Sequence, residues 1–363
     1  MEIYLDNAAT SHPKPACTLR AVQDAMTRFN ANPGRAGHAR SLAAGRLVLE
    51  ARETLARALG ARDPFCVVHA FNCTDALNLA IKGCLKRGDH VVSTMLEHNS
   101  VLRVLMEKQK RGEIAVTLVR PRGYFVDARD VQRALRPNTR LIAVTHASNV
   151  TGAVQPVEEI CQLARRKGIL SLVDGAQRLG GAPVDVKAMG CSLYAFPGHK
   201  SLLGPTGTGG LYIEPGLALD TVREGGTGSS SDSMLQPKDP PERYEAGTLN
   251  LAGIAGLRAG LQRTSQRGAE DGIALEAARL HRRGQQHAFI SGQILRQRTV
   301  VHGAFRQPAQ PIGDLFLFLP VRAAQQQVGR FSLGDGWHMD KAQIRIDEHI
   351  AQLARRAVGD FHV

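Results

Sequence analysis

The feature that most constrains the fold is a regular alternation, from Pro64 to Ile213, of short β-branched runs and amphipathic helical patterns. The runs are CVVHAF, HVVST, IAVTLVR, RLIAVTHAS and ILSLVDGA, and each is largely apolar on both of its faces. Strands of this kind are typical of a parallel sheet that helices cover on both sides. We therefore predict an α/β protein with a mainly parallel sheet.

Polar side chains that could bind a ligand or take part in catalysis lie at the ends of the predicted strands. Open α/β sheets bind their ligands at the carboxyl ends of the strands, so we expect these side chains to share one site. They are Cys73, Thr74, His98, Asn149, Asp174, Gln177 and Lys200.

Composition limits the class of protein. The length of 363 residues favours two domains over one, and the six cysteines form no CxxC pair, so we expect neither disulfides nor a metal site. The net charge of +13 suggests nucleic-acid binding, but the basic residues are scattered and aromatic residues make up 5%. Base stacking needs more aromatic side chains than this, so we expect a solvated basic surface and no nucleic-acid partner.

No apolar run approaches the ~20 residues of a membrane span, and the start, MEIYLDNAATSHPKP, does not have the pattern of a secretory signal. We therefore expect a cytoplasmic enzyme with no membrane partner.

A carboxylate, an amide and an amine at one sheet edge match the requirements of pyridoxal 5'-phosphate (PLP) chemistry. Lys200, in a glycine-rich turn, would form a Schiff base with the cofactor aldehyde, and Asp174 would hold the pyridine nitrogen protonated. Gln177 would donate to the phenolic oxygen. Thr74, where a strand passes into a helix, would bind the phosphate with nearby backbone N–H groups.

Each of these residues also has a simpler interpretation. A lysine in a glycine-rich turn is usually a surface lysine, and an aspartate at a strand end is commonly a helix cap or a metal ligand. Thr74 would serve equally as an ordinary N-cap, and His98 as a hydrogen-bonded loop histidine. The order and strand-end placement of the whole set favour the cofactor.

Longer motifs carry a resemblance to a known family. They are YLDNAAT (4–10), NPGRAGH (32–38), CTDALN (73–78), EHNS (97–100), HASNVTG (146–152), VDGAQ (173–177), GHKSLLGPTGTGGLY (198–212) and EAGTLNLAGIAGL (245–257). In this order, over residues 1 to about 262, the chain resembles the cysteine desulfurase branch of the class V aminotransferases, which are fold-type I PLP enzymes.

The resemblance implies a fold-type I architecture. A segment of residues 1–15 would precede a large PLP-binding domain, 16–257, with a mainly parallel seven-stranded sheet. A smaller, divergent α+β domain would follow at 258–363.

The resemblance also implies roles for single residues. Lys200 would be the Schiff-base lysine, with Asp174 and Gln177 as above. His98 would stack on the ring and help in proton transfer, and Asn149 would lie near the phenolic oxygen and the substrate. The phosphate-binding positions of the family are matched by Cys73, Thr74 and His199. Thr248 matches a residue that a neighbouring subunit offers to the phosphate, which implies a homodimer.

The chain departs from the family pattern in three places. Pro197 stands where the family has a hydroxyl residue, so the phosphate site should lose donors and bind more weakly. The last 172 residues contain no cysteine, although the family takes up sulfur on a C-terminal cysteine. The C-terminal region matches poorly, which leaves open a deletion or frame disturbance there. In it, Arg330 of GRFSLGDG is a candidate for binding the substrate carboxylate, or equally a surface arginine.

The sequence thus predicts an enzyme that releases sulfur and alanine from L-cysteine or a related amino acid, with a possible sulfur-acceptor protein. A transaminating or β-eliminating enzyme of the same family and a weakly active PLP-binding protein remain alternatives.

Overall fold

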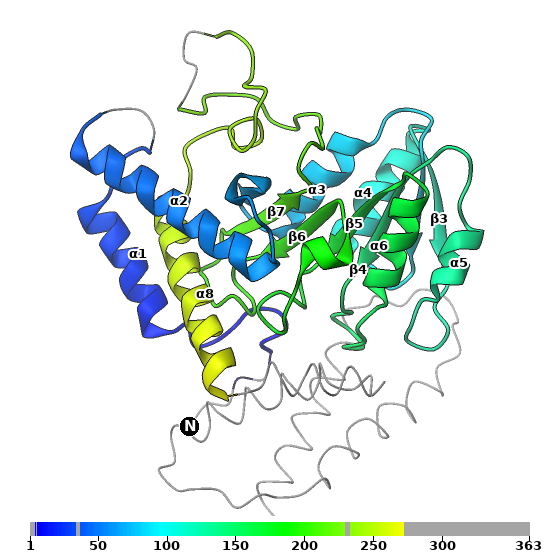
Figure 1. Ribbon diagram of the computed structural model, residues 1–363, viewed down its shortest axis with the longest axis horizontal. Helices are drawn as coiled ribbons and strands as arrows, with labels where there is room; N and C mark the ends of the chain where they lie inside the picture. The colour runs from blue at the N-terminus through cyan, green and yellow to red at the C-terminus, as the bar shows by residue number, and fades with distance from the viewer. Residues whose placement is uncertain (1–3, 5, 34–36, 229–232, 272–363) are drawn as a thin grey trace, which may run out of the picture. The chain divides into compact units, whose positions relative to one another are not determined.

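A computed structural model describes residues 4, 6–33, 37–228 and 233–271 (Figure 1). These residues belong to the first of the two units into which the chain divides, Met1–Gln297. Most of the α+β domain expected at 258–363 lies outside the described residues, and so do the strand-like runs VVHGAF and DLFLFLPV, the helical run DKAQIRIDEHIAQLARRA and Arg330.

A seven-stranded sheet forms the centre of the described unit, in the order β1-β7-β6-β5-β4-β2-β3. All neighbours from β6 to β3 pair in parallel, whereas β7 is antiparallel to both β6 and β1. The six strands other than β7 therefore point the same way and end at one edge. Their bounds are Val67–Ala70, His90–Thr94, Ala115–Val119, Thr139–Thr145, Leu170–Asp174, Leu193–Pro197 and Gly209–Ile213 for β1 to β7. The predicted mainly parallel sheet is confirmed.

Helices cover both faces of this sheet (Figure 1). Helices α3 (Cys73–Cys84) and α4 (Asn99–Lys110) pack on one face. Helices α5 (Ala128–Arg133), α6 (Val157–Arg166) and α7 (Val186–Met189) pack on the other, together with parts of α2 (Ala39–Leu59) and α8 (Leu251–Asp271). Helix α1 (Ala16–Arg28) packs beside α8, and a short 3₁₀ turn, Pro64–Cys66, precedes β1.

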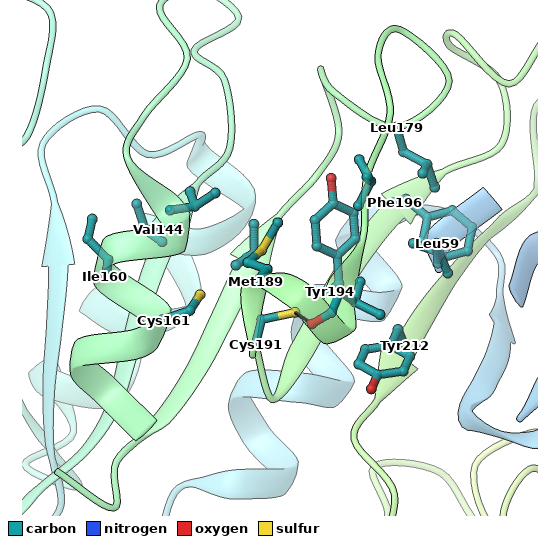
Figure 2. Close-up of a cluster of buried hydrophobic side chains, with 14 of the residues drawn as sticks. Leu59, Val144, Ile160, Cys161, Leu179, Met189, Cys191, Tyr194, Phe196 and Tyr212 are labelled. Carbon is teal, nitrogen blue, oxygen red and sulfur yellow. Dashed lines mark hydrogen bonds between the residues drawn. The ribbon is translucent and has the colours of Figure 1, made fainter. Parts of the chain in front are cut away.

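The core has two layers because successive strand residues point to opposite faces. In β4, Leu141 and Ala143 join the cluster under α3 and α4, while Ile142 and Val144 join the cluster under α6. Figure 2 shows the second cluster, with the fully buried ring of Tyr194 at its centre. Both faces must be apolar, which explains the apolar runs in the sequence.

The five strands predicted from the apolar runs are present as β1 to β5, with ends that differ by up to three residues, and a helix follows each of the first four. The pattern did not single out β6, β7, α1 or α2. Helix α8 continues through the expected domain boundary at 257/258, and that boundary stays a prediction. Within the described ranges, no helix is both long and apolar enough to span a membrane.

Candidate active site

The carboxyl edge of the sheet brings Asp174 and Lys200 together. Asp174 is the last residue of β5 and is 3% exposed, and Lys200 follows the end of β6 by three residues. Burial raises the pKa of Asp174, and the charges of Lys200 and His98 oppose that rise. Burial likewise lowers the pKa of Lys200, against the opposing charge of Asp174. A lysine with a lowered pKa is more often a neutral amine, the form that attacks a carbonyl.

The turn between β6 and Lys200 requires glycine. A Cβ built on Gly198 would lie 2.1 Å from Oγ1 of Thr208, which is closer than real Cβ contacts come. The N–H of Gly198 donates to the carbonyl of Thr208, and the N–H of Leu203 donates to that of Lys200. These bonds fix the backbone on both sides of Lys200, so its position depends on the start of β7.

The N-terminal segment clamps the residue before Lys200. The carbonyl of His199 accepts from the Thr10 hydroxyl at 3.2 Å, from the N–H and hydroxyl of Ser11 at 3.2 and 3.1 Å, and from Nζ of Lys14 at 2.6 Å. Burial lowers the pKa of Lys14 to about 8. Burial, followed by the charges of Lys200 and Lys14, lowers the pKa of His199 to about 4, so this imidazole is neutral at pH 7.

The starts of α3 and α4 are joined by hydroxyl groups. Oγ1 of Thr74 lies 2.8 Å from Oγ of Ser100, which lies 2.9 Å from Nδ1 of His98. Nδ1 also accepts from the N–H of Ser100 at 3.1 Å, so His98 caps α4 and its neutral ring carries the proton on Nε2. Burial lowers the pKa of His98, and the charge of Asp174 opposes the shift.

The first turn of α3 has free backbone donors. Asn72 caps this helix by accepting from the N–H of Asp75 at 2.9 Å. The N–H groups of Cys73 and Thr74 have no acceptor among the described residues, as expected in the first turn of a helix. Such donors and the helix dipole attract phosphate. Pro197, by contrast, ends β6 with neither an N–H nor a hydroxyl to add.

The other predicted residues are placed differently. Nε2 of Gln177 donates to the carbonyl of Ala8 at 3.1 Å, which links this amide to the N-terminal segment. Asn149 is exposed in the turn after β4. Thr248 is also exposed, and it lines a pocket with His69, Arg223 and the start of β7 rather than contacting Lys200.

Three further residues at this edge were not predicted from the sequence. Lys14 contacts His199 as described above. His146 is buried just after β4, with its Nδ1 2.9 Å from the hydroxyl of Tyr194. Glu97 is 6% exposed, and its pKa is raised to about 8 by burial. Their positions in the sequence could have indicated two of them, because His146 and Glu97 also follow apolar strands. Lys14 lies in the polar N-terminal segment.

The arrangement fits a pyridoxal cofactor. Lys200 and the buried Asp174 each shift the pKa of the other, and a helix N-terminus with open N–H groups contacts Asp174 through Cys73. The carboxylate could hold a ring nitrogen, and the helix could hold a phosphate. Among the described residues, no group of three or more His, Cys, Asp or Glu is arranged to hold a metal ion.

Comparison with known proteins agrees with this geometry. The family model for class-V aminotransferases matches residues 3–287. A probable cysteine desulfurase of Methanothermobacter thermautotrophicus is 38% identical over 71% of this chain and 66% of its own length. One from Mycolicibacterium paratuberculosis is 32% identical over 98% of this chain and 51% of its own length. The chain thus spans between about half and just under two thirds of these curated relatives.

Solved structures extend the likeness to three dimensions. The apo cysteine desulfurase from Thermococcus onnurineus NA1 superposes with a TM-score of 0.70 at 32% identity, over 77% of this chain and 71% of that one. The cysteine desulfurase CsdA from Escherichia coli gives 0.64 at 30% identity, over 76% and 72%. The chain therefore belongs to the class-V aminotransferase family, in its cysteine desulfurase branch.

Proposed function

We propose that this protein is a PLP-dependent enzyme that removes sulfur from L-cysteine or a related amino acid. The observation that carries the proposal is the placement of Lys200 and the buried Asp174 at the same carboxyl edge of the sheet, where the charge of each shifts the pKa of the other. The similar protein SspA has been solved in complex with cysteine, at 29% identity over 72% of each chain with a TM-score of 0.65, which supports an amino-acid substrate.

Each group of this chain has a role in the proposal. Lys200 would hold the cofactor through its amine, and the same amine could take the Cα proton of the substrate. Asp174 would accept a hydrogen bond from the ring nitrogen and keep it cationic. When bound, PLP supplies an electron sink for the bonds at Cα. Asn149 and Gln177 would bind near the phenolic oxygen, and His98 would lie on the ring face.

The phosphate would lie at the start of α3. The free N–H groups of Cys73 and Thr74 and the Thr74 hydroxyl support this, and His199 is proposed to bind the phosphate as well. Thr248 of a second subunit would complete the phosphate site in a homodimer, which equilibrium sedimentation tests. Arg330 is proposed to bind the substrate carboxylate. A cytoplasmic location belongs to the same proposal, and cell fractionation tests it.

Sulfur transfer requires a thiol. In the reaction L-cysteine and a thiol give L-alanine and a persulfide, and a reductant then releases sulfide. Buried thiols in the described unit have raised pKa values: about 11 for Cys66, and about 12 for Cys84 and Cys161. Because such buried thiols stay protonated at neutral pH, we propose that the acceptor is a thiol of another molecule, such as an acceptor protein.

The missing C-terminal cysteine also favours a second candidate, a transaminating or β-eliminating enzyme of the same family. Product analysis separates the two. Alanine and sulfide in equal amounts from L-cysteine with dithiothreitol support desulfuration, whereas a keto acid from an amino donor without sulfide supports transamination. Pyruvate with sulfide supports β-elimination. Bound PLP with no turnover would leave a PLP-binding protein.

The first prediction concerns Lys200. Protein reconstituted with PLP should be yellow, and Lys200→Ala should abolish the visible absorbance band because it removes the amine that binds the aldehyde. The exposed Lys187, on α7, provides the matched control, and Lys187→Ala should keep the band. A Lys200→Ala protein with an unchanged band would refute the PLP assignment.

A further inference from the structure

The thiol of Cys73 contacts the carboxylate of the proposed site. Cys73 is the first residue of α3, and its Sγ lies 3.6 Å from Oδ1 of Asp174, within hydrogen-bond range for sulfur. The thiols of Cys17, Cys84 and Cys191 instead reach backbone carbonyls. Cys73 is thus directed at a charged side chain that lies 101 positions away in the sequence.

The contact is made to one carboxylate oxygen. Oδ1 of Asp174 accepts from Cys73 and also from the N–H of Ala176 at 2.9 Å. In the part of the chain that the structure describes, no hydrogen bond reaches Oδ2. Two donors on Oδ1 fix the rotation of the carboxylate and leave Oδ2 as the oxygen that can accept from a bound ring nitrogen.

Cys73 acts here as a thiol and not as a thiolate. Burial raises the pKa of Cys73 well above its ordinary value, and the charge of Asp174 raises it further. The S–H proton therefore remains in place at neutral pH and is available for donation. The raised pKa also argues against Cys73 as the thiolate that would attack the substrate sulfur.

We propose that Cys73 is a positioning residue for Asp174. Its S–H holds Oδ1, so that Oδ2 faces the ring nitrogen of the cofactor, and it favours the ionised carboxylate. The proposal rests on the proposed function, because only bound PLP supplies the ring nitrogen that Asp174 would contact. A donor to the charged form of a carboxylate lowers the pKa of that carboxylate, so removing Cys73 should raise the pKa of Asp174.

The first test uses the protein without cofactor. The rate at which Cys73 is alkylated is measured against pH by mass spectrometry in wild type, Asp174→Asn and Asp75→Asn. Loss of the Asp174 charge should lower the pKa of Cys73, and alkylation should become about tenfold faster each time that pKa falls by one. Asp75→Asn is the control, because the Asp75 carboxylate lies in the same turn but accepts from the N–H of Phe71 and not from the Cys73 thiol. Alkylation of Cys73 in Asp75→Asn should therefore be as fast as in wild type. Equal rates in Asp174→Asn and wild type would overturn the contact.

The second test uses protein loaded with PLP. Cys73→Ala should weaken PLP binding about three- to tenfold, the effect of losing one hydrogen bond, and move the pH midpoint of the visible band. Cys73→Ser keeps a donor and should restore both values in part. Cys191→Ala, which removes a buried thiol that bonds a backbone carbonyl, should leave the midpoint unchanged. An unchanged midpoint in Cys73→Ala would overturn the positioning role.

The first test is independent of the proposed function, whereas the second depends on it. If Lys200 forms no visible band with PLP, the proposed function is wrong, and the role of Cys73 toward a ring nitrogen is wrong with it. The alkylation rates still decide whether Cys73 binds Asp174.

Discussion

At the scale of single residues, the site depends on buried groups whose protonation differs from that in water. Asp174 and Glu97 are both buried carboxyl groups at the carboxyl edge of the sheet. Asp174 has Lys200 and His98 as nearby cationic or ionisable partners. The Thr94 hydroxyl donates to Oε1 of Glu97 at 2.6 Å, and among the described residues no hydrogen bond reaches its Oε2. Its pKa of about 8 therefore means that Glu97 is mostly protonated at neutral pH.

Glu97 should make stability depend on pH. Its pKa rises from an ordinary 4.5 when unfolded to about 8 when folded, so between these values the folded state binds more protons. The free energy of unfolding should then fall as pH rises through this window, by up to about 1.4 kcal/mol per pH unit. Glu97→Gln, which keeps the shape without a titrating proton, should flatten the slope.

Urea unfolding from pH 4.5 to 8.5 measures this effect. Glu107→Gln, on the exposed side of α4, serves as the control and should retain the wild-type slope. The same slope in Glu97→Gln and wild type would show that Glu97 does not titrate in this window.

At the scale of elements, the start of α3 links strand β1 to the site. The side chain of Asn72 accepts from the N–H of Asp75, and its carbonyl accepts from the N–H of Ala76. A Cβ on Gly209, at the start of β7, would lie 2.8 Å from the carbonyl carbon of Asn72. Strand β7 therefore packs directly against this turn, which explains a glycine there.

Asn72→Ala should remove the cap of α3 and lower the free energy of unfolding by about 1 kcal/mol. Asn72→Asp keeps an oxygen at the same position, so its loss should be smaller. Because the cap orders the N–H groups proposed to bind phosphate, PLP should also bind more weakly to Asn72→Ala. Urea titrations and PLP titrations measure the two effects, and equal stability of Asn72→Ala and wild type would contradict the capping role.

At the scale of the whole described unit, a buried ion pair joins distant parts of the chain. Arg52 of α2 donates to both carboxylate oxygens of Glu245 at 2.8 Å, and their side chains are 4% and 6% exposed. Glu245 also accepts from the N–H of His69 at 2.5 Å, and Arg52 donates to the carbonyl of Val67. Helix α2, strand β1 and the segment before α8 are thereby held together.

Breaking this pair should be costly. Glu245→Ala should lower the free energy of unfolding by about 3–5 kcal/mol because it leaves the Arg52 guanidinium buried without its partner. The double variant Arg52→Met with Glu245→Leu should lose less, since it removes both buried charges. Denaturant unfolding of Arg52→Met, Glu245→Leu and the double variant measures the coupling, and additive losses would show that the two side chains do not interact.

The sequence by itself determined the sheet and most of the residues at its edge. Apolar runs such as HVVST carry their own signal because a strand covered on both faces must be apolar on both. Asp174 ends such a strand and His98 follows one closely, so both could be found from the pattern, whereas Lys200 could be found from the glycine-rich turn that contains it. The family likeness followed from motifs that are continuous in the chain.

Tertiary structure decided what those residues touch. The clamp of Thr10, Ser11 and Lys14 on His199 joins positions about 185 to 189 apart, and no local pattern encodes such a distance. The sulfur of Cys73 meets Asp174 because β1 and β5 end at the same edge, and the protonation of Glu97 follows from burial that its neighbours create. Contacts and desolvation of this kind arise from the packing of distant segments, so they exist only in the folded chain.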